Sequence, residues 1–507
     1  MPAPEQPVTD ALSTEHLRSD LKGRSVRGGL LTLTSQGTQF LIQSVSTIVL
    51  ARLLTPADFG LVAMVSTITG LGQAFADLGL SEATIQRKEI TRDQVDFLFW
   101  VNVAVGFTLT FITASSASIL AKFYHDPRLV GITLVMSLTF LIGGLRVQPD
   151  ALLKRQMRFS LLAIRDIAAY VIGVAIAIVM AVRGWGYWAL VALPLTLNST
   201  QMALSWVMVN WRPGLPRRNA KARSMIAFGG NVAASYLLIT VNRSADNVLI
   251  GWHSGAGPLG LYSRAYNLLM LPVRQLSVPA ASVTVPAFSR IQSDSERFAR
   301  YYLRAVNLII WISAPVFGFL FVAAQPVILL MLGQQWRAAT PVFQILVVSA
   351  LGQLLLESVV WLFVSRGQSE LLLKSLLLIS PIIIASFAVG LPFGIKGVAV
   401  SGSAGLLGVL PWLLRFAFRG TDLTLRRLGN ALLCPLATSL IGVLLTEVLL
   451  HVTRPERILA QLFTAALGFA ASLLASALIP PVRDEIISFR ELLRELRFPN
   501  RATEAAT

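Results

Sequence analysis

The sequence predicts an all-α fold, a polytopic membrane bundle of about 14 transmembrane helices. Of the 507 residues, 54% are hydrophobic and only 14% are charged, whereas soluble chains carry about a quarter charged residues. The mean hydropathy is +0.67. Apolar segments of roughly 20 residues, the length that crosses a bilayer core of about 30 Å, recur along the chain with short connections.

The apolar segments define the predicted spans in order. They lie near residues 28–51, 58–80, 96–120, 129–148, 160–182, 185–209, 225–250, 262–288, 304–332, 341–364, 370–391, 395–417, 430–451 and 458–479. Most of the 43 Lys and Arg residues fall in every second connection and near both ends, for example Arg155, Arg158 and Arg165 in one connection. Because cytoplasmic loops are enriched in Lys and Arg, we expect both termini in the cytoplasm.

A weak internal repeat divides the predicted bundle. Gly60-Leu61 and Gly260-Leu261 each follow a basic segment and one long span. The spans before them are six apart and cross in the same direction, which predicts a parallel six-helix repeat. The expected parts are a cytoplasmic tail (1–27), an N-lobe (28–211), a C-lobe (212–420), two further spans (421–481) and a cytoplasmic amphipathic tail (482–507).

Composition and motifs narrow the function classes. A net charge of +17 could suit nucleic acid, but the basic clusters are short and lie between apolar spans, so no nucleic-acid partner is expected. The chain has one cysteine, Cys434, and four scattered histidines, so no metal site is expected. It has no phosphate-binding loop and no nucleophile motif, so we expect neither a cofactor nor catalytic residues. The polar first residues predict no cleavable signal peptide.

Several predicted spans carry polar residues that lipid would reject. They are Gln36, Gln39 and Gln43 on the first span, Asn231, Asn242, Arg243 and Asp246 on the seventh, Arg264 and Arg274 on the eighth, and Glu357 on the tenth. A charged side chain at membrane depth costs about 2.5–3.5 kcal/mol or more and usually faces a bundle interior or a watery cavity. The glutamines could equally hydrogen-bond between helices. Arg243 and Asp246 could instead form a structural salt bridge.

Three segments carry a family resemblance. They are Thr55-Pro56-Ala57-Asp58-Phe59-Gly60-Leu61, Asp246-Asn247-Val248-Leu249-Ile250-Gly251 and Pro286-Ala287-Phe288-Ser289-Arg290. Together they resemble the bacterial polysaccharide transporters, the O-antigen and exopolysaccharide flippases, close to their colanic-acid-exporter branch. This family belongs to the multidrug/oligosaccharidyl-lipid/polysaccharide superfamily. The resemblance covers roughly residues 25–420.

The resemblance implies two six-helix lobes around a central cavity, plus two extra helices. It implies that undecaprenyl-diphosphate-linked oligosaccharides are moved across the inner membrane by alternating access. The expected surroundings and partners are membrane lipid and a polysaccharide polymerase or export machinery. Two alternatives stay open: a drug or cation antiporter of the same superfamily, and a membrane polysaccharide polymerase.

Roles for the polar residues follow from this expected substrate. The diphosphate would be held by arginines, because one guanidinium group can donate two parallel hydrogen bonds to phosphate oxygens. These arginines are Arg243, Arg274, Arg264 and Arg52. Gln36, Gln39, Gln43, Asn231 and Asn242 would bind the sugars. Asp246 or Glu357 would couple transport to an ion.

Overall fold

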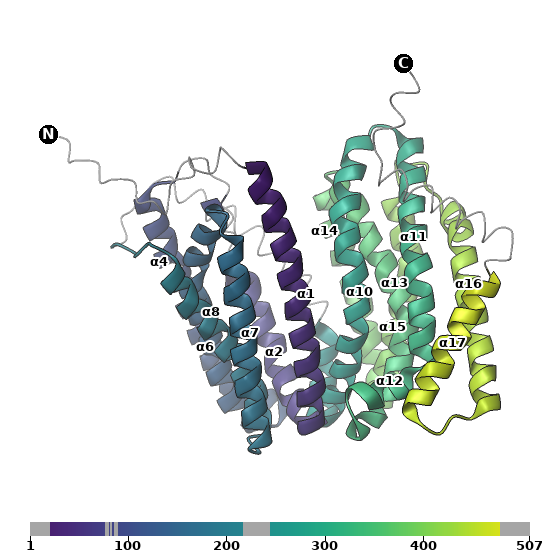
Figure 1. The fold of residues 1–507 in the computed structure, drawn as a ribbon, viewed down its shortest axis with the longest axis horizontal. Coiled ribbons are helices and arrows are strands. Elements are labelled where there is room, and N and C mark those ends of the chain that lie inside the picture. The colour runs from purple at the N-terminus through teal and green to yellow at the C-terminus, as the bar shows by residue number, and fades with distance from the viewer. Residues whose placement is uncertain (1–20, 77–80, 82–83, 86–89, 216–243, 477–507) are drawn as a thin grey trace. The chain divides into compact units, whose positions relative to one another are not determined.

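The computed structural model describes residues 21–76, 81, 84–85, 90–215 and 244–476, and the ordered elements in these ranges are helical (Figure 1). The chain divides into two compact units, residues 1–263 and 264–507. The helices before residue 209 are α1 (Leu21–Leu53), α2 (Pro56–Ala76), α4 (Arg92–Ser115), α5 (Ala117–Tyr124), α6 (Arg128–Arg155), α7 (Phe159–Val182) and α8 (Tyr187–Met208). The later ones are α10 (Ala256–Ile291), α11 (Ser295–Val322), α12 (Ala324–Met331), α13 (Thr340–Ser365), α14 (Ser369–Gly390), α15 (Gly394–Ala417), α16 (Leu425–Thr453) and α17 (Ile458–Ser476).

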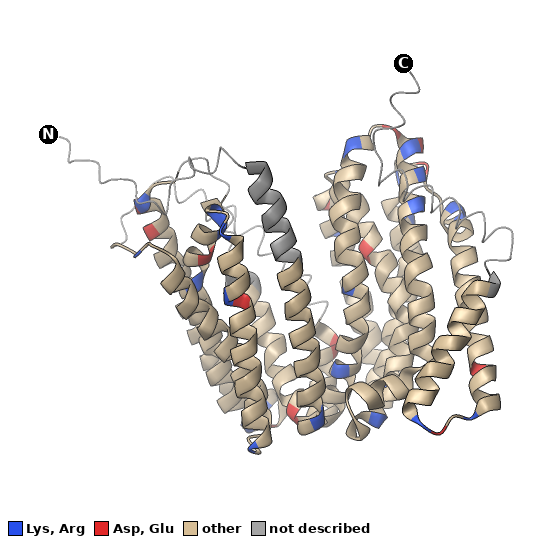
Figure 2. Cartoon of the chain, viewed as in Figure 1, with Lys and Arg blue, Asp and Glu red and all other residues tan. Residues whose placement is uncertain are grey.

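These helices have the length and composition of membrane spans. Among the described residues, eight helical stretches are long and apolar enough to cross a membrane, with α14 and α15 counted as one stretch. Charged residues gather near the helix ends and are sparse between them (Figure 2). Many large apolar side chains are exposed, such as Leu440 and Val448 on α16, as lipid contact requires. The chain is therefore an all-α, multi-pass membrane protein.

Within the first unit, four pairs of helices make the main contacts. α4 lies beside α6, α7 beside α8, α1 against α7, and α6 against α8. α4 starts where it does because the Thr91 hydroxyl accepts a hydrogen bond from the Gln94 backbone amide, and the Gln94 side-chain oxygen accepts one from the Thr91 backbone amide. The predicted cytoplasmic tails, residues 1–27 and 482–507, lie largely or wholly outside the described residues.

The same element pattern occurs again in the second unit. Like Thr91 before α4, Asp294 before α11 caps its helix by accepting from the Arg297 amide at 3.0 Å. A single residue separates α4 from the eight-residue helix α5. In the same way, a single residue separates α11 from the eight-residue helix α12. The spans predicted near 96–120 and 304–332 each contain two helices in the structure, with the breaks at Ser116 and Ala323. The breaks coincide with local sequence features, since Ser115 and Ser116 stand at the first and Gln325 and Pro326 follow shortly after the second.

An aromatic cluster forms the centre of the second unit. Tyr302 of α11 is fully buried, with ring centroids 6.1 Å from Phe288 of α10 and 5.9 Å from Phe418. Its hydroxyl lies 2.9 Å from the Ser358 hydroxyl of α13, which supplies the partner that a buried phenol needs. Ser439 of α16 donates to the Ala314 carbonyl of α11 at 2.7 Å, which attaches the last helix pair to this unit.

The two glycines of the predicted repeat meet in a reciprocal contact. A Cβ atom on Gly60 would lie 1.7 Å from the Ala256 carbonyl oxygen, and one on Gly260 would lie 1.8 Å from the Pro56 carbonyl oxygen. Pro56 and Ala256 are the first residues of α2 and α10. Each helix therefore presses its first carbonyl onto the glycine four residues into the other, an approach that only a residue without a side chain permits.

We predict that Gly60→Ala destabilises the protein by about 1–3 kcal/mol, the usual cost of forcing extra atoms into a packed contact. Gly70→Ala, on the same helix, is the matched control because nothing lies within 4 Å of its added Cβ. Thermal unfolding of the purified proteins in detergent checks the pair. Equal unfolding temperatures for the two variants would show that the contact at Gly60 is looser than described.

Candidate functional site

Arg274 is an exposed arginine on α10, a helix long and apolar enough to cross a membrane. This helix has 36 residues, about 54 Å at 1.5 Å per residue, and Arg274 lies at its middle. The side chains of Arg274, Asn267 and Gln275 are all exposed. No described carboxylate forms an ion pair with Arg274. A guanidinium in this position is available to an anionic ligand.

The other arginines predicted to bind phosphate are less clearly placed for it. Arg264 is half-buried and lies ten residues before Arg274, or about 15 Å along the axis of α10. A diphosphate held by both would therefore have to lie along the helix. Arg52 is exposed in the last turn of α1. Arg243 lies outside the described residues, as do Asn231 and Asn242.

The predicted glutamine face of α1 is partly available to a ligand. Gln36 and Gln43 are exposed, whereas Gln39 is half-buried and donates from Nε2 to the Ser35 hydroxyl at 2.9 Å. The main described neighbour of α1 is α7, and Ser46, one turn after Gln43, is buried. Gln36 and Gln43 are seven residues apart, two helical turns, so they lie on one side of α1.

The two residues predicted to couple ions differ in their surroundings. Asp246 is buried and accepts hydrogen bonds from the Tyr262 hydroxyl at 3.0 Å and from the Asn247 amide at 2.7 Å. Glu357 is half-buried on α13. Because Arg243 is not described, the structure leaves the alternative of an Arg243–Asp246 salt bridge as a prediction.

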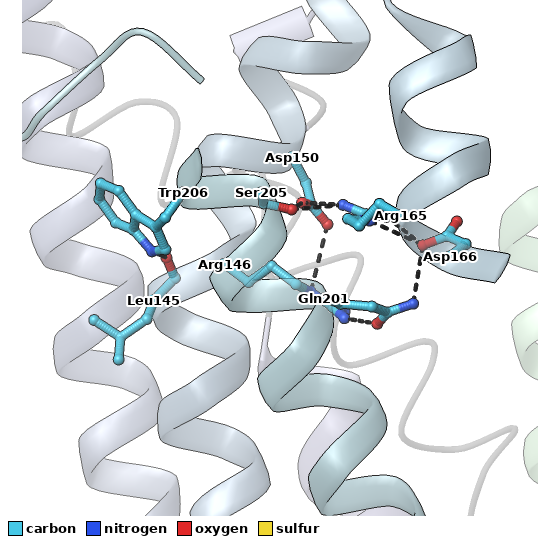
Figure 3. Close-up of polar contacts among 8 residues, drawn as sticks. All are labelled: Leu145, Arg146, Asp150, Arg165, Asp166, Gln201, Ser205 and Trp206. Carbon is cyan, nitrogen blue, oxygen red and sulfur yellow. Dashed lines mark hydrogen bonds and ion pairs between the residues drawn. The ribbon is translucent and has the colours of Figure 1, made fainter. Parts of the chain in front are cut away.

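An ionic network lies inside the first unit (Figure 3). Arg165 of α7 is central, with a side chain only 7% exposed. It forms ion pairs with Asp150 of α6 and, at 2.7 Å, with Asp166 of its own helix. Arg146, one turn before Asp150 on α6, lies 3.4 Å from the same carboxylate.

Residues of α8 complete the network. Gln201 accepts from Arg146 and donates to Asp166 at 2.9 Å, and the Ser205 hydroxyl donates to Asp150 at 2.7 Å. Trp206 adds a hydrogen bond from its indole nitrogen to the Leu145 carbonyl at 3.1 Å. The network therefore connects α6, α7 and α8 through side chains (Figure 3).

The pairing of charges within the ionic network indicates whether it can bind an anionic ligand. The two guanidinium groups are matched by two carboxylates, so the charges of the cluster balance, and both groups also donate to α8, to Gln201 and Ser205. We infer that it fastens three helices rather than binding phosphate. Sequence reasoning placed Arg165 in a cytoplasmic connection, which is wrong because the residue is buried in α7. One feature of the sequence could have predicted this network. Arg146 and Asp150 carry opposite charges four residues apart within an apolar helix, a spacing that allows an ion pair.

We predict that Arg165→Ala destabilises the protein by roughly 3 kcal/mol, because it removes a buried cation from the half-buried Asp166 and leaves Asp150 with Arg146 alone. The control is Arg128→Ala. Arg128 is 53% exposed, and its guanidinium donates to Asp126, which lowers the pKa of that carboxyl. An exposed pair of this kind contributes about 0–1 kcal/mol. Thermal unfolding in detergent measures both changes, and an Arg165→Ala protein as stable as Arg128→Ala would contradict the fastening role.

Comparisons with known proteins agree with this architecture. A family model described as "Polysaccharide biosynthesis protein" matches residues 49–341, more than half of the chain. The Lipopolysaccharide biosynthesis protein WzxC of Escherichia coli (strain K12) is 26% identical over 306 residues, which cover 60% of this chain and 62% of that protein. The Teichuronic acid biosynthesis protein TuaB of Bacillus subtilis (strain 168) is 24% identical over 363 residues, which cover 71% and 73%.

A solved structure shares the fold. "Lipid II flippase MurJ, inward closed conformation" superposes with a TM-score of 0.71 at 12% identity, over 92% of this chain and all of that one. At this identity the likeness establishes the fold alone. The match over residues 49–341 establishes that the chain belongs to the polysaccharide biosynthesis protein family.

Proposed function

We propose that this protein is a flippase that moves undecaprenyl-diphosphate-linked oligosaccharide repeat units across the bacterial inner membrane by alternating access. The single observation that carries the proposal is Arg274, an exposed guanidinium at the middle of a membrane-spanning helix with no described carboxylate beside it. Facing lipid it would cost about 2.5–3.5 kcal/mol or more, whereas a diphosphate in a watery cavity compensates that cost. Family membership and relatives named for lipopolysaccharide and teichuronic acid biosynthesis support the substrate class.

The proposed membrane arrangement has 14 spans with both termini in the cytoplasm. Residues 28–211 and 212–420 form the two lobes, and residues 421–481 form a further helix pair. The enrichment of Lys and Arg in alternate connections supports this orientation. The recurring pattern of capped helix followed by an eight-residue helix, in α4–α5 and α11–α12, supports two related lobes.

Within this proposal, different polar residues bind different parts of the substrate. Arg274, Arg264, Arg243 and Arg52 hold the diphosphate, and Gln36, Gln39, Gln43, Asn231 and Asn242 contact the sugars. Asp246, a buried carboxylate whose described donors are both neutral, and Glu357 are the candidates for ion coupling. Translocation makes and breaks no covalent bond, so the protein needs no catalytic group and is not an enzyme. A polysaccharide polymerase on the outer side would consume the product.

Gene deletion, or depletion where deletion is lethal, tests the proposed function. Lipid-linked oligosaccharide and secreted polymer are measured in the same cells. We expect the lipid-linked units to accumulate inside and the polymer to disappear, with wild-type gene on a plasmid reversing both. Unchanged polymer together with raised drug sensitivity would instead identify an efflux antiporter.

We predict that replacing Arg243 and Arg274 by alanine abolishes complementation of the deletion without lowering the amount of protein in the membrane. The matched control is Arg290→Ala, an exposed arginine in the last turn of the same helix α10, which should complement normally. Polymer output and immunoblotted membrane fractions are the measurements. Normal polymer output from the Arg243→Ala/Arg274→Ala variant would remove the arginines from the binding site.

A further inference from the structure

Three prolines give α10 an unusual backbone. Pro272, Pro279 and Pro286 lie inside the helix at intervals of seven residues. Proline has no N–H, so the carbonyl four residues before it loses its helical hydrogen bond. The carbonyls affected are those of Leu268, Gln275 and Ser282. Positions seven apart drift by only about 20° around a helix, so these acceptors form a row along one side.

Two of these carbonyls belong to the exposed side of α10. Gln275 and Ser282 are exposed, as are Pro279 and Pro286, whose missing N–H groups leave the carbonyls free. Leu268, by contrast, is half-buried and packs against the cluster of Ala323, Val327 and Ala465. The exposed row therefore begins next to Arg274 and runs toward the C-terminal end of the helix, with the exposed side chains of Val278 and Val283 beside it.

The row offers hydrogen-bond acceptors, the main-chain carbonyls of Gln275 and Ser282, next to one cation, the guanidinium of Arg274. The Ser282 hydroxyl donates to the Pro279 carbonyl at 2.7 Å, so its own oxygen remains an acceptor. Main-chain carbonyls cannot bind phosphate oxygens, because both are acceptors. The positive charge of Arg274, next to Gln275, disfavours a metal cation at the row. A ligand with many hydroxyl donors, which a saccharide is, meets these requirements.

We propose that the carbonyls of Gln275 and Ser282, freed by Pro279 and Pro286, form a saccharide subsite on α10. The inference rests on the proposed function, because Arg274 then anchors the diphosphate of the same substrate. The phosphate sits at Arg274 and the sugars extend along the row toward Ser282. Each free carbonyl accepts a hydrogen bond from a ring hydroxyl, and the side-chain amide of Gln275 and the hydroxyl of Ser282 add further partners.

Binding measurements with two probes test this subsite. The full-length protein in lipid nanodiscs is titrated with the lipid-linked oligosaccharide pool purified from deletion cells, and separately with undecaprenyl diphosphate, which has no sugar. Pro279→Ala/Pro286→Ala restores both N–H groups and removes both acceptors without changing any polar side chain. We expect about tenfold weaker binding of the sugar-bearing lipid, as for two lost hydrogen bonds, and unchanged binding of undecaprenyl diphosphate.

Two controls separate the subsite from other effects. Pro272→Ala straightens the same helix but restores a donor to Leu268, a half-buried residue, so it should bind both probes like the wild type. Arg274→Ala should weaken both probes. If the double variant does not purify as a monodisperse protein, Pro286→Ala alone should weaken only the sugar-bearing lipid, by about threefold.

The outcomes that overturn the inference are specific. If the proline variant binds both probes like the wild type, or loses both equally, the prolines act through helix shape and not through their carbonyls. If the proline variant and Pro272→Ala lose the sugar-bearing lipid alike, bending of α10 is the cause. If the wild type binds neither probe, the proposed function itself fails and the subsite fails with it.

Discussion

Every polar group at membrane depth in this protein needs a protein partner or water, and this constraint separates its polar residues into two kinds. The Arg146–Asp150–Arg165–Asp166 network satisfies the requirement internally, through ion pairs and through Gln201 and Ser205. Arg274, Gln275 and Ser282 of α10 have exposed side chains at a depth where lipid would be costly. The first group therefore belongs to the architecture, and we propose that the second contacts a solvated ligand, although Val278 and Val283 beside it are also exposed.

Close helix contacts and polar networks act at different places in the fold. At the start of α2 and α10, Gly60 and Gly260 allow two backbones to touch, and any side chain there would collide with a carbonyl. Within the first unit, the ionic network joins α6 to α7 and α8. Neither the glycine contact nor the ionic network involves the exposed residues Arg274, Gln275 and Ser282 of α10. A binding surface on a helix that is fixed elsewhere can be polar without weakening the fold.

Hydropathy predicted the helices well where an apolar run coincides with a helix. The spans expected at 160–182 and 370–391 match α7 (Phe159–Val182) and α14 (Ser369–Gly390) within one residue. The side chains of Gln36, Gln43 and Arg274, polar residues predicted within spans, are exposed, and their role as a binding site stays a prediction. The breaks after α4 and α11 lie at Ser115-Ser116 and just before Gln325-Pro326, short features that an average over a long apolar segment does not resolve. The burial of Arg165 could not be predicted, because it depends on which helices are neighbours. A single sequence shows that Arg165 is charged, but not that Asp150 lies beside it.

The central claim is that the exposed side of α10 faces water and not lipid, and cysteine reactivity tests it directly. The chain has a single native cysteine, so Cys434→Ser supplies a background without thiols. Gln275→Cys and Ser282→Cys are compared with Leu440→Cys on the apolar surface of α16, using a membrane-impermeant maleimide on inverted vesicles. A thiol reacts as its thiolate, which forms only in water. We predict rapid labelling at 275 and 282 and slow labelling at 440. Equally slow labelling at all three positions would contradict a solvated face on α10.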